Sequence, residues 1–207
     1  MPFSGEIRVV SHHDCDGICS GAIIAKALMR EGRRFRLSFV KQLTGDVIDW
    51  LSKEENRLLV FLDMGSGQLG AIQSRLMKSG ETVIILDHHQ PQGEVLSDRL
   101  HQINTCMMGM GENISGSGIA YLLARAMNPE NKDLSEVGVV GAIGDSQIDS
   151  IGPDWGLFGL NKEIVKDAVS LGGMKVERGL RIWGKTTRPI HKALENLFSV
   201  RTPLTIL

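Results

Sequence analysis

Residues 58–89 of the 207-residue chain read LLVFLDMGSGQLGAIQSRLMKSGETVIILDHH and predict one strand–helix–strand unit. Residues 58–62 are apolar throughout and residues 82–86 are apolar after Thr82, as strands buried on both faces are. Between them, residues 69–78 have the spacing of a helix, which Gly80 ends. Two short strands separated by a helix predict parallel pairing in an open sheet.

The same alternation continues on both sides of this unit. We expect strands at 7–10, 35–40 and about 101–104, and helices at 17–30, from a cap at Ser115 or Ser117 to about Met127, and at 161–170. The predicted fold class is therefore α/β, a mostly parallel β-sheet flanked by helices, followed by a helical C-terminal part. We expect the α/β core at 1–110 and the helical part at 111–200.

Composition excludes several classes of protein. Apolar residues make up 42% of the chain, which is enough for a sizeable core, and the net charge of −1 gives no general attraction to nucleic acid. Three cysteines without regular spacing argue against a disulfide framework and against a zinc site of the CxxC type. The N-terminus does not resemble a signal peptide and no stretch is long enough to span a bilayer, so we expect a cytoplasmic protein with no membrane partner.

The first polar segment follows the first expected strand and reads HHDCDG at residues 12–17. In an extended loop alternate side chains point the same way, so His12, Asp14 and Asp16 would converge. Two carboxylates forced together repel each other unless a cation neutralises them. The alternative is a solvated polar turn with an aspartate that caps the next helix.

Three more segments place acids in comparable positions. Asp63 and Asp87 directly follow the strands at 58–62 and 82–86, and the carboxyl ends of parallel strands form the ligand-binding edge of an open sheet. His88 and His89 come next, and Asp145 ends the apolar, glycine-spaced run 137–143. Taken singly, each of these segments could also be a polar turn or a helix cap.

Together the four segments supply enough carboxylates and imidazoles for two cations about 3.5–4 Å apart that share a bridging carboxylate. Mixed oxygen and nitrogen ligands favour Mn²⁺ as the cofactor over Mg²⁺, which prefers oxygen and water. Mg²⁺ is the alternative cofactor.

A competing pattern is the glycine-rich sequence GSGQLG at residues 65–70. It follows a strand and precedes a helix, and Asp87 comes about 20 residues later, where a dinucleotide-binding fold places its ribose-binding acid. This alternative does not explain His12, His88 or Asp145.

The order HxDxDG, Asp-x-Gly, Asp-His-His and Gly-Asp resembles the DHH phosphoesterase superfamily over nearly the whole chain. Further stretches are similar to the archaeal RecJ-like single-strand exonucleases, namely residues 103–104, 115–121, 140–147, 159–164 and 184–189. Every motif position of the superfamily is filled.

The resemblance implies a role for each motif residue. One metal ion would be held by His12, Asp14 and Asp63. The other would be held by Asp16, Asp63, His88 and Asp145, with Asp63 as the bridge. The catalytic candidates would be Asp87, which orients a histidine, and His89, which contacts the scissile phosphate.

Such enzymes usually carry a second, C-terminal substrate-binding domain. We expect the catalytic domain to fill residues 1–200, and residues 201–207 to begin the linker to a domain that this sequence does not contain. Lysines and arginines gather after residue 174, and among them Lys185 and Arg188 are the candidates for substrate phosphate contacts. A solvated helix face is the alternative for each of them.

The expected function is that of a metal-dependent phosphodiesterase, a single-strand-specific exonuclease that hydrolyses DNA or RNA by a two-metal mechanism. One alternative is a related enzyme for small substrates: oligoribonucleotides, cyclic dinucleotides or pyrophosphate. Another is a RecJ-like replisome scaffold that binds GINS-type proteins.

Overall fold

The structure is a computed structural model that describes residues 5–55, 57–78, 80–109, 114–149, 156–177, 184 and 187–199. The chain forms two compact units, Met1–Met174 and Lys175–Leu207, and each is described by itself. The second unit contains the helix α7 (Ile190–Ser199). The expected linker at 201–207 lies outside the described residues, and the expected domain limits stay predictions.

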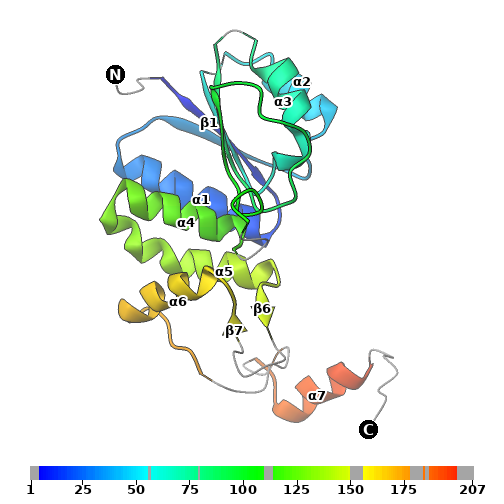
Figure 1. The fold of residues 1–207 in the computed structure, drawn as a ribbon. Helices are drawn as coiled ribbons and strands as arrows, with labels where there is room; N and C mark the ends of the chain where they lie inside the picture. The colour runs from blue at the N-terminus through cyan, green and yellow to red at the C-terminus, as the bar shows by residue number, and fades with distance from the viewer. Residues whose placement is uncertain are drawn as a thin grey trace. The chain divides into compact units, whose positions relative to one another are not determined.

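A five-stranded parallel sheet forms the centre of the first unit (Figure 1). Its order is β2-β1-β3-β4-β5, and the strands are β1 (Ile7–His12), β2 (Phe35–Val40), β3 (Leu58–Leu62), β4 (Thr82–Leu86) and β5 (Leu100–Ile103). All four neighbouring pairs are parallel, so the predicted α/β fold is confirmed. The register pairs Leu62 with Leu86 and Leu86 with Ile103, so these strands end level with one another.

Helices cover both faces of the sheet (Figure 1). On one face lie α2 (Gly45–Leu51) and α3 (Leu69–Leu76), the latter after a short 3-10 helix, η1 (Ser66–Gln68); on the other lie α1 (Cys15–Arg30) and α4 (Gly116–Met127). Val60 and Leu62 belong to the apolar core beside α1 and α4, whereas Leu59 and Phe61 belong to the core beside α2 and α3. This two-sided burial explains why β3 is apolar at every position.

Two further helices extend this side of the unit: the first packs against α1 and α4, and the second packs mainly against the first. They are α5 (Ser135–Gly144), which follows the 3-10 helix η2 (Pro129–Leu134), and α6 (Asn161–Ser170). Between α5 and α6 runs a short antiparallel pair, β6 (Ile148–Asp149) and β7 (Gly156–Leu157). Asp167 of α6 accepts a hydrogen bond of 2.7 Å from Tyr121 and forms ion pairs with Arg125 and Lys132, so this one carboxylate joins α4, η2 and α6.

The expected helices at 161–170 and after a serine cap are confirmed. Ser115 is that cap, because its side chain accepts a 3.1 Å hydrogen bond from the backbone amide of Gly118. The glycine-spaced run 137–143 lies in α5. A Cβ on Gly141 would lie 2.2 Å from the hydroxyl of Ser117, so α5 approaches α4 closely only because this residue is glycine.

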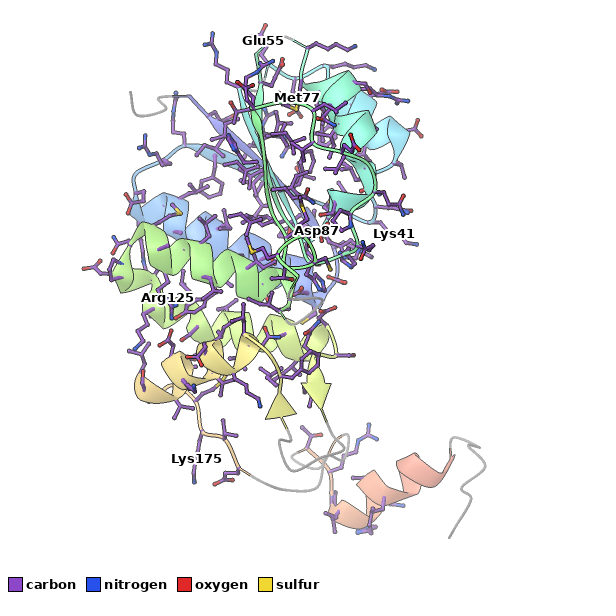
Figure 2. The ribbon with its side chains drawn as sticks, in the orientation of Figure 1. Lys41, Glu55, Met77, Asp87, Arg125 and Lys175 are labelled. Atoms are coloured by element: carbon purple, nitrogen blue, oxygen red, sulfur yellow. The ribbon has the colours of Figure 1, made fainter. Side chains whose placement is uncertain are left out.

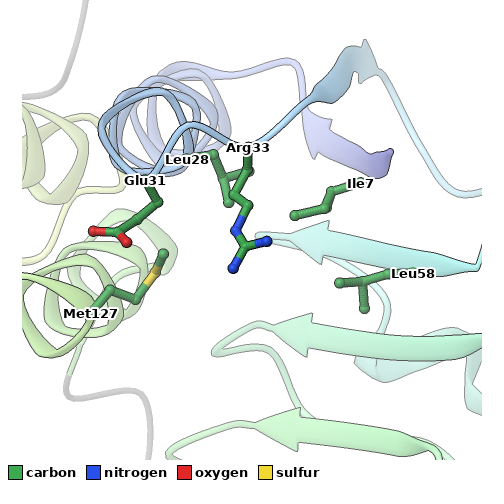
Figure 3. Close-up of a pocket in the computed structure, with 6 residues that line it drawn as sticks. All are labelled: Ile7, Leu28, Glu31, Arg33, Leu58 and Met127. Carbon is green, nitrogen blue, oxygen red and sulfur yellow. The ribbon is translucent and has the colours of Figure 1, made fainter. Parts of the chain in front are cut away.

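The amino end of the sheet has a hollow of its own. Its volume is about 320 Å³, and mostly apolar side chains line it together with Glu31 and Arg33 (Figure 3). Among the described residues, the groups of acids and histidines suited to a metal ion contain none of this lining. None of the described helices is both long enough and apolar enough to cross a membrane.

Candidate metal centre

The acids and histidines predicted to form a site gather at the carboxyl edge of the sheet. His12 is the last residue of β1, Asp63 directly follows β3, and Asp87 directly follows β4. The backbone amide of Asp63 donates to the carbonyl of Leu86 at 2.8 Å, so the loops after β3 and β4 start side by side. Figure 2 labels Asp87 at this edge, and Lys41, which follows β2, lies at the same edge.

The first segment is not the extended loop that the sequence suggested. Helix α1 already begins at Cys15, and Asp14 is its N-cap, with Oδ1 accepting a 3.0 Å hydrogen bond from the amide of Gly17. A Cβ on Gly17 would lie 2.3 Å from the carbonyl oxygen of His12, so the sharp entry into the helix requires glycine. The capped helical turn, rather than an alternating extended chain, therefore brings Asp14 and Asp16 to the site.

His12, Asp14 and Asp63 form the first group of potential ligands. Nδ1 of His12 lies 2.9 Å from Oδ2 of Asp14 and 3.6 Å from Oδ2 of Asp63. Its other ring nitrogen, Nε2, lies 3.0 Å from the carbonyl oxygen of Lys41. A carbonyl only accepts, so Nε2 donates, and in the neutral ring the lone pair of Nδ1 faces the carboxylates, as in a metal-binding histidine.

Asp16, His88 and Asp145 form the second group. Nε2 of His88 lies 3.9 Å from Oδ2 of Asp16 and 3.6 Å from Oδ2 of Asp145. It also lies 3.4 Å from Oδ1 of Asp63, whose other oxygen faces the first group. Asp63 thus presents one oxygen to each group, which is the geometry of a bridging carboxylate.

Other parts of the fold position the acids of the second group. The backbone amides of Gly116 and Ser117 donate to the two oxygens of Asp16 at 2.6 and 3.0 Å, so the carboxylate sits at the positive N-terminal end of α4. Gln147 donates to Oδ2 of Asp145 at 3.1 Å, and Asn161 donates to Gln147 at 3.3 Å. Gly116 and Ser117 were not among the predicted site residues, because a backbone donor has no side-chain signature in a sequence. Gln147 and Asn161 act through their side chains and lie in the stretches 140–147 and 159–164 that carried the family resemblance.

Asp87 is buried and hydrogen-bonded through both oxygens. Oδ1 lies 2.7 Å from Nδ1 of His89 and accepts from the amide of His88, while Oδ2 accepts from the amide of Ser66 at 3.0 Å. Asp87 therefore fixes the ring of His89, which stays 58% exposed. These bonds leave the carboxylate unsuited to the ribose-binding role of the dinucleotide alternative.

The loop after β5 supports the same histidine. Asn104 follows β5 directly and donates to the carbonyl oxygen of His89 at 2.8 Å and to the hydroxyl of Ser66 at 2.9 Å. It belongs to the stretch 103–104 that carried the family resemblance, and its place at a strand end was the available signal.

Two basic residues were predicted to contact substrate phosphates. Arg188 is exposed and belongs to the second unit, and Lys185 lies outside the described residues. Their roles stay predictions.

Burial and mutual repulsion change the acidity of the cluster. Burial raises the pKa of Asp63 to about 7, against the lowering effect of His88 and with a further rise from Asp16. Burial also raises the pKa of Asp145, although His88 acts against it. Burial lowers the pKa of His88, but Asp63 and Asp145 outweigh it and hold that pKa above its usual value. The hydrogen bond to Asp87 raises the pKa of His89 to about 9.

Several buried nitrogen and oxygen atoms of the cluster have no hydrogen-bond partner, and they indicate whether the cluster suits a cation. Among the described residues, Nδ1 of His12, Oδ1 of Asp63 and both ring nitrogens of His88 are buried without a hydrogen-bond partner. Such atoms are costly to bury, and a divalent cation in each group would use the lone pairs of His12, Asp63 and His88. The residues present therefore fit two metal ions.

Comparison of the sequence with known proteins gives three matches of note. The DHH family, N-terminal domain, matches residues 6–142. An uncharacterized protein of Methanocaldococcus jannaschii is 40% identical over 171 residues, which are 79% of this chain and 37% of that protein. The single-stranded-DNA-specific exonuclease RecJ of Thermus thermophilus is 25% identical over 203 residues, which are 94% of this chain and 29% of RecJ. The chain thus spans about a third of the length of these two relatives.

Solved structures share the fold. RecJ from Thermus thermophilus in complex with Mn²⁺ has a TM-score of 0.61 at 22% identity, covering 81% of this chain and 24% of RecJ. An exonuclease RecJ bound to manganese scores 0.62 at 21% identity and covers 81% of this chain and 43% of that one. CDC45 from Entamoeba histolytica has a TM-score of 0.61 at 13% identity, and the match covers 89% of this chain and 37% of CDC45. At these identities the likeness shows the fold alone.

Proposed function

Because this chain belongs to the DHH family, we propose that it is a metal-dependent phosphodiesterase that degrades single-stranded nucleic acid from an end. The observation that carries the proposal is the position of Asp63, whose two oxygens face two separate groups of ligands. The similarity to RecJ supports a hydrolase, and a polyanionic strand is the substrate class that a pair of cations suits.

The metal sites follow from the two groups. His12, Asp14 and Asp63 hold one ion; Asp16, Asp63, His88 and Asp145 hold the other. Mn²⁺ is the proposed ion, because the donors mix imidazole and carboxylate and because two RecJ structures of this fold are described as Mn²⁺ complexes. When bound, such a pair polarises the phosphoryl group and lowers the pKa of water.

The residues of the chain itself then orient the phosphate. Asp87 raises the pKa of His89 above its usual value and fixes the ring, so that the exposed imidazole can donate to a phosphoryl oxygen. In the hydrolysis, the bond from phosphorus to the leaving sugar oxygen breaks and a bond to the oxygen of water forms. One proton of that water ends on the leaving oxygen.

A second candidate function is that of a replisome scaffold that binds GINS-type proteins. The likeness of the fold to CDC45 is the observation that favours it. A scaffold has no need of the buried ligand atoms around Asp63, so the metal centre favours catalysis.

The decisive experiment measures hydrolysis of labelled single-stranded DNA and RNA with Mn²⁺. We expect the wild-type protein to release short products. In Asp63→Asn the rate of hydrolysis should fall on the order of 10³-fold, because both ion sites lose their shared ligand. Asp98→Asn is the matched control: this exposed acid precedes β5 at the other edge of the sheet and should leave the rate unchanged.

Two results would contradict the proposal. One is a wild-type protein that hydrolyses neither DNA, RNA nor dinucleotides with Mn²⁺ or Mg²⁺. The other is an Asp63→Asn variant as active as wild type. A preference for dinucleotides over long strands would instead favour the small-substrate enzyme.

A further inference from the structure

One buried asparagine connects the supports of two acids in the second group of ligands. Asn161 is the first residue of α6 and is fully buried, yet its side chain does not cap that helix, because the N-cap is Leu160. The amide of Asn161 lies against the first turn of α4 instead: a Cβ on Gly118 would lie 2.9 Å from its Oδ1. The side chain therefore makes its polar contacts outside its own helix.

The backbone amide of Ser115 determines how the side-chain amide of Asn161 is oriented. This N–H only donates and lies 3.4 Å from Oδ1, so the oxygen of Asn161 faces α4 and its NH₂ group faces away. Nδ2 of Asn161 then donates to Oε1 of Gln147 at 3.3 Å. This leaves Nε2 of Gln147 to donate to Oδ2 of Asp145 at 3.1 Å. Every donor in this chain of hydrogen bonds therefore points towards Asp145.

The same serine begins the helix that holds Asp16. Ser115 caps α4, and the next two backbone amides, those of Gly116 and Ser117, donate to the carboxylate of Asp16. The hydroxyl of Ser115 also lies 3.4 Å from Oδ1 of Asn161. Asn161 thus stands between the supports of two carboxylates that are far apart in the sequence.

The acid at the end of this chain has few other supports. Apart from the ring of His88, the amide of Gln147 is the one polar group of the described residues in contact with the carboxylate of Asp145. Gln147 is itself buried, so an amide without its partner there would be costly. Replacing a residue that holds a metal ligand from behind typically lowers metal affinity about 10–100-fold.

The first group of ligands is supported by different contacts. His12 donates to the carbonyl of Lys41, and Asp14 accepts from the amide of Gly17. Among the described residues, the side-chain hydrogen bonds of Asn161 go to α4 and to Gln147, and none reaches His12 or Asp14. A change in Asn161 should therefore act on one ion site and spare the other.

We propose that Asn161 is a positioning residue for the ion of the second group, holding Asp145 through Gln147 and the capped start of α4 through Ser115. The inference rests on the proposed function, since it concerns one ion of the same centre. It assigns the two ions separate supports, so that one ion is lost without the other.

Calorimetric titration with Mn²⁺ in the absence of substrate tests this assignment. We expect two ions to bind to each wild-type chain. In Asn161→Ala, the affinity for one ion should stay as in wild type and the affinity for the other should fall about 10–100-fold. Asp14→Asn removes a ligand of the first group, so the double variant with Asn161→Ala should bind both ions weakly.

Electron paramagnetic resonance provides a second readout that a purely structural role would not change. With two equivalents of Mn²⁺, wild type should show the coupled spectrum of two neighbouring ions. Asn161→Ala should show the spectrum of an isolated ion under the same conditions.

Asn131→Ala is the matched control. Asn131 is equally buried and donates to the carbonyl of Ala124, near the other end of α4, at 2.8 Å. Its replacement should destabilise the fold and leave both Mn²⁺ affinities unchanged. The comparison therefore separates a loss of stability from the loss of an ion.

Gln147→Ala breaks the last link and leaves Asn161 on Ser115, so it tests the same role should Asn161→Ala fail to fold. It should also weaken the binding of one ion only. The double variant of Asn161 and Gln147 should weaken that ion little more than either single variant, because both remove the same chain of hydrogen bonds.

The positioning role is overturned if Asn161→Ala and Gln147→Ala bind both ions like wild type, or if they weaken both ions equally. It is also overturned if Asn131→Ala loses the same ion, or if the wild-type chain binds fewer than two Mn²⁺. Selective loss of one ion in a protein that hydrolyses no nucleic acid would support the positioning role and refute the proposed function.

Discussion

Asp63 combines three unusual properties in one residue. Its φ is 58°, in the left-handed region that side chains other than glycine rarely adopt, and its side chain is 2% exposed. Burial also raises its pKa to about 7. Strained backbone and a destabilised charge persist where the surrounding fold enforces them, which is typical of functional sites.

The raised pKa makes stability depend on pH in the metal-free protein. The unfolded chain loses the proton of Asp63 near its ordinary pKa of 3.8, whereas the folded chain keeps it to about 7. Folding therefore takes up a proton between these values, and the contribution of Asp63 to stability falls as pH rises through that window. We therefore expect the free energy of unfolding of Asp63→Asn, relative to that of wild type, to rise by up to about 1.4 kcal/mol per pH unit in this window. It should rise no further above pH 7.

Urea unfolding in EDTA at a series of pH values from 4 to 8 measures this difference. Asp98→Asn provides the reference for the loss of an ordinary exposed acid. Parallel stability curves for wild type and Asp63→Asn would show that burial does not raise the pKa of this carboxyl.

Sequence alone could locate the site residues that follow strands. Asp63 and Asp87 end apolar runs, and the edge of a parallel sheet is set by where its strands stop. The partners of Asp16 and His12 were less visible. Gly116 and Ser117 act through backbone amides, and the carbonyl of Lys41 orients His12, so no side chain marks these contacts.

The N-terminus of α4 lies against the metal centre with almost no space between them. A Cβ on Gly116 would lie 2.8 Å from Oδ1 of Asp63 and 3.0 Å from Oδ2 of Asp16. We therefore expect Gly116→Ala to displace both carboxylates, to lower Mn²⁺ affinity at least about tenfold and to cost about 1–3 kcal/mol of stability. Calorimetric Mn²⁺ titration and urea unfolding measure the two effects.

Gly70→Ala is the control for the glycine substitution. Gly70 lies in α3, and a Cβ there would meet nothing within 4 Å. Because alanine favours helix over glycine, this variant should be more stable by up to about 1 kcal/mol and bind Mn²⁺ normally. Equal Mn²⁺ affinity of the two variants would refute the role assigned to Gly116.

Individual helices were predicted with unequal success. The helix after Ser115 was visible because a serine cap precedes a periodic run, and the helix at 161–170 because polar and apolar residues alternate with helical spacing. Helix α5 was not assigned, because Gly138 and Ala142 face the interior while Val140 and Ile143 are exposed, so the apolar residues show no single stripe. Helix α2 has seven residues, too few to establish a period.

Ligands from His12 to Asp145 make the metal centre a link between most elements of the first unit. Cations bound by the two groups would hold β1, α1, β3, β4 and α5 together and would bind only the folded chain. At a free Mn²⁺ concentration about 100 times Kd, such binding raises the free energy of unfolding by about 2.7 kcal/mol. For a chain of this size that corresponds to a rise in Tm of about 5–10 °C.

Differential scanning calorimetry with Mn²⁺ and with EDTA checks this expectation. Asp63→Asn should show no comparable rise, whereas Asp98→Asn should match wild type. A Tm that does not respond to Mn²⁺ in the wild-type protein would mean that the two groups of ligands hold no ion.

The alternation of strands and helices was enough to predict the sheet and its parallel pairing. It was not enough for the division of the chain at residue 174, because the sequence analysis treated 111–200 as one helical part. The helix α7 was not assigned, although Ile190, Ala193 and Leu194 stand at helical spacing. The relatives of which this chain spans 37% and 29% are much longer than the chain itself.

The wide spacing of the ligands also bears on synthesis of the protein by the ribosome. A nascent chain that has emerged through residue 89, just after β4, already carries His12, Asp14, Asp63 and His88, yet it lacks both Asp145 and the α4 amides that hold Asp16. The second ion then has an incomplete set of donors. The last residue of the second group, Asp145, is translated after the whole five-stranded sheet, so this group is complete only once α4 and α5 have been made.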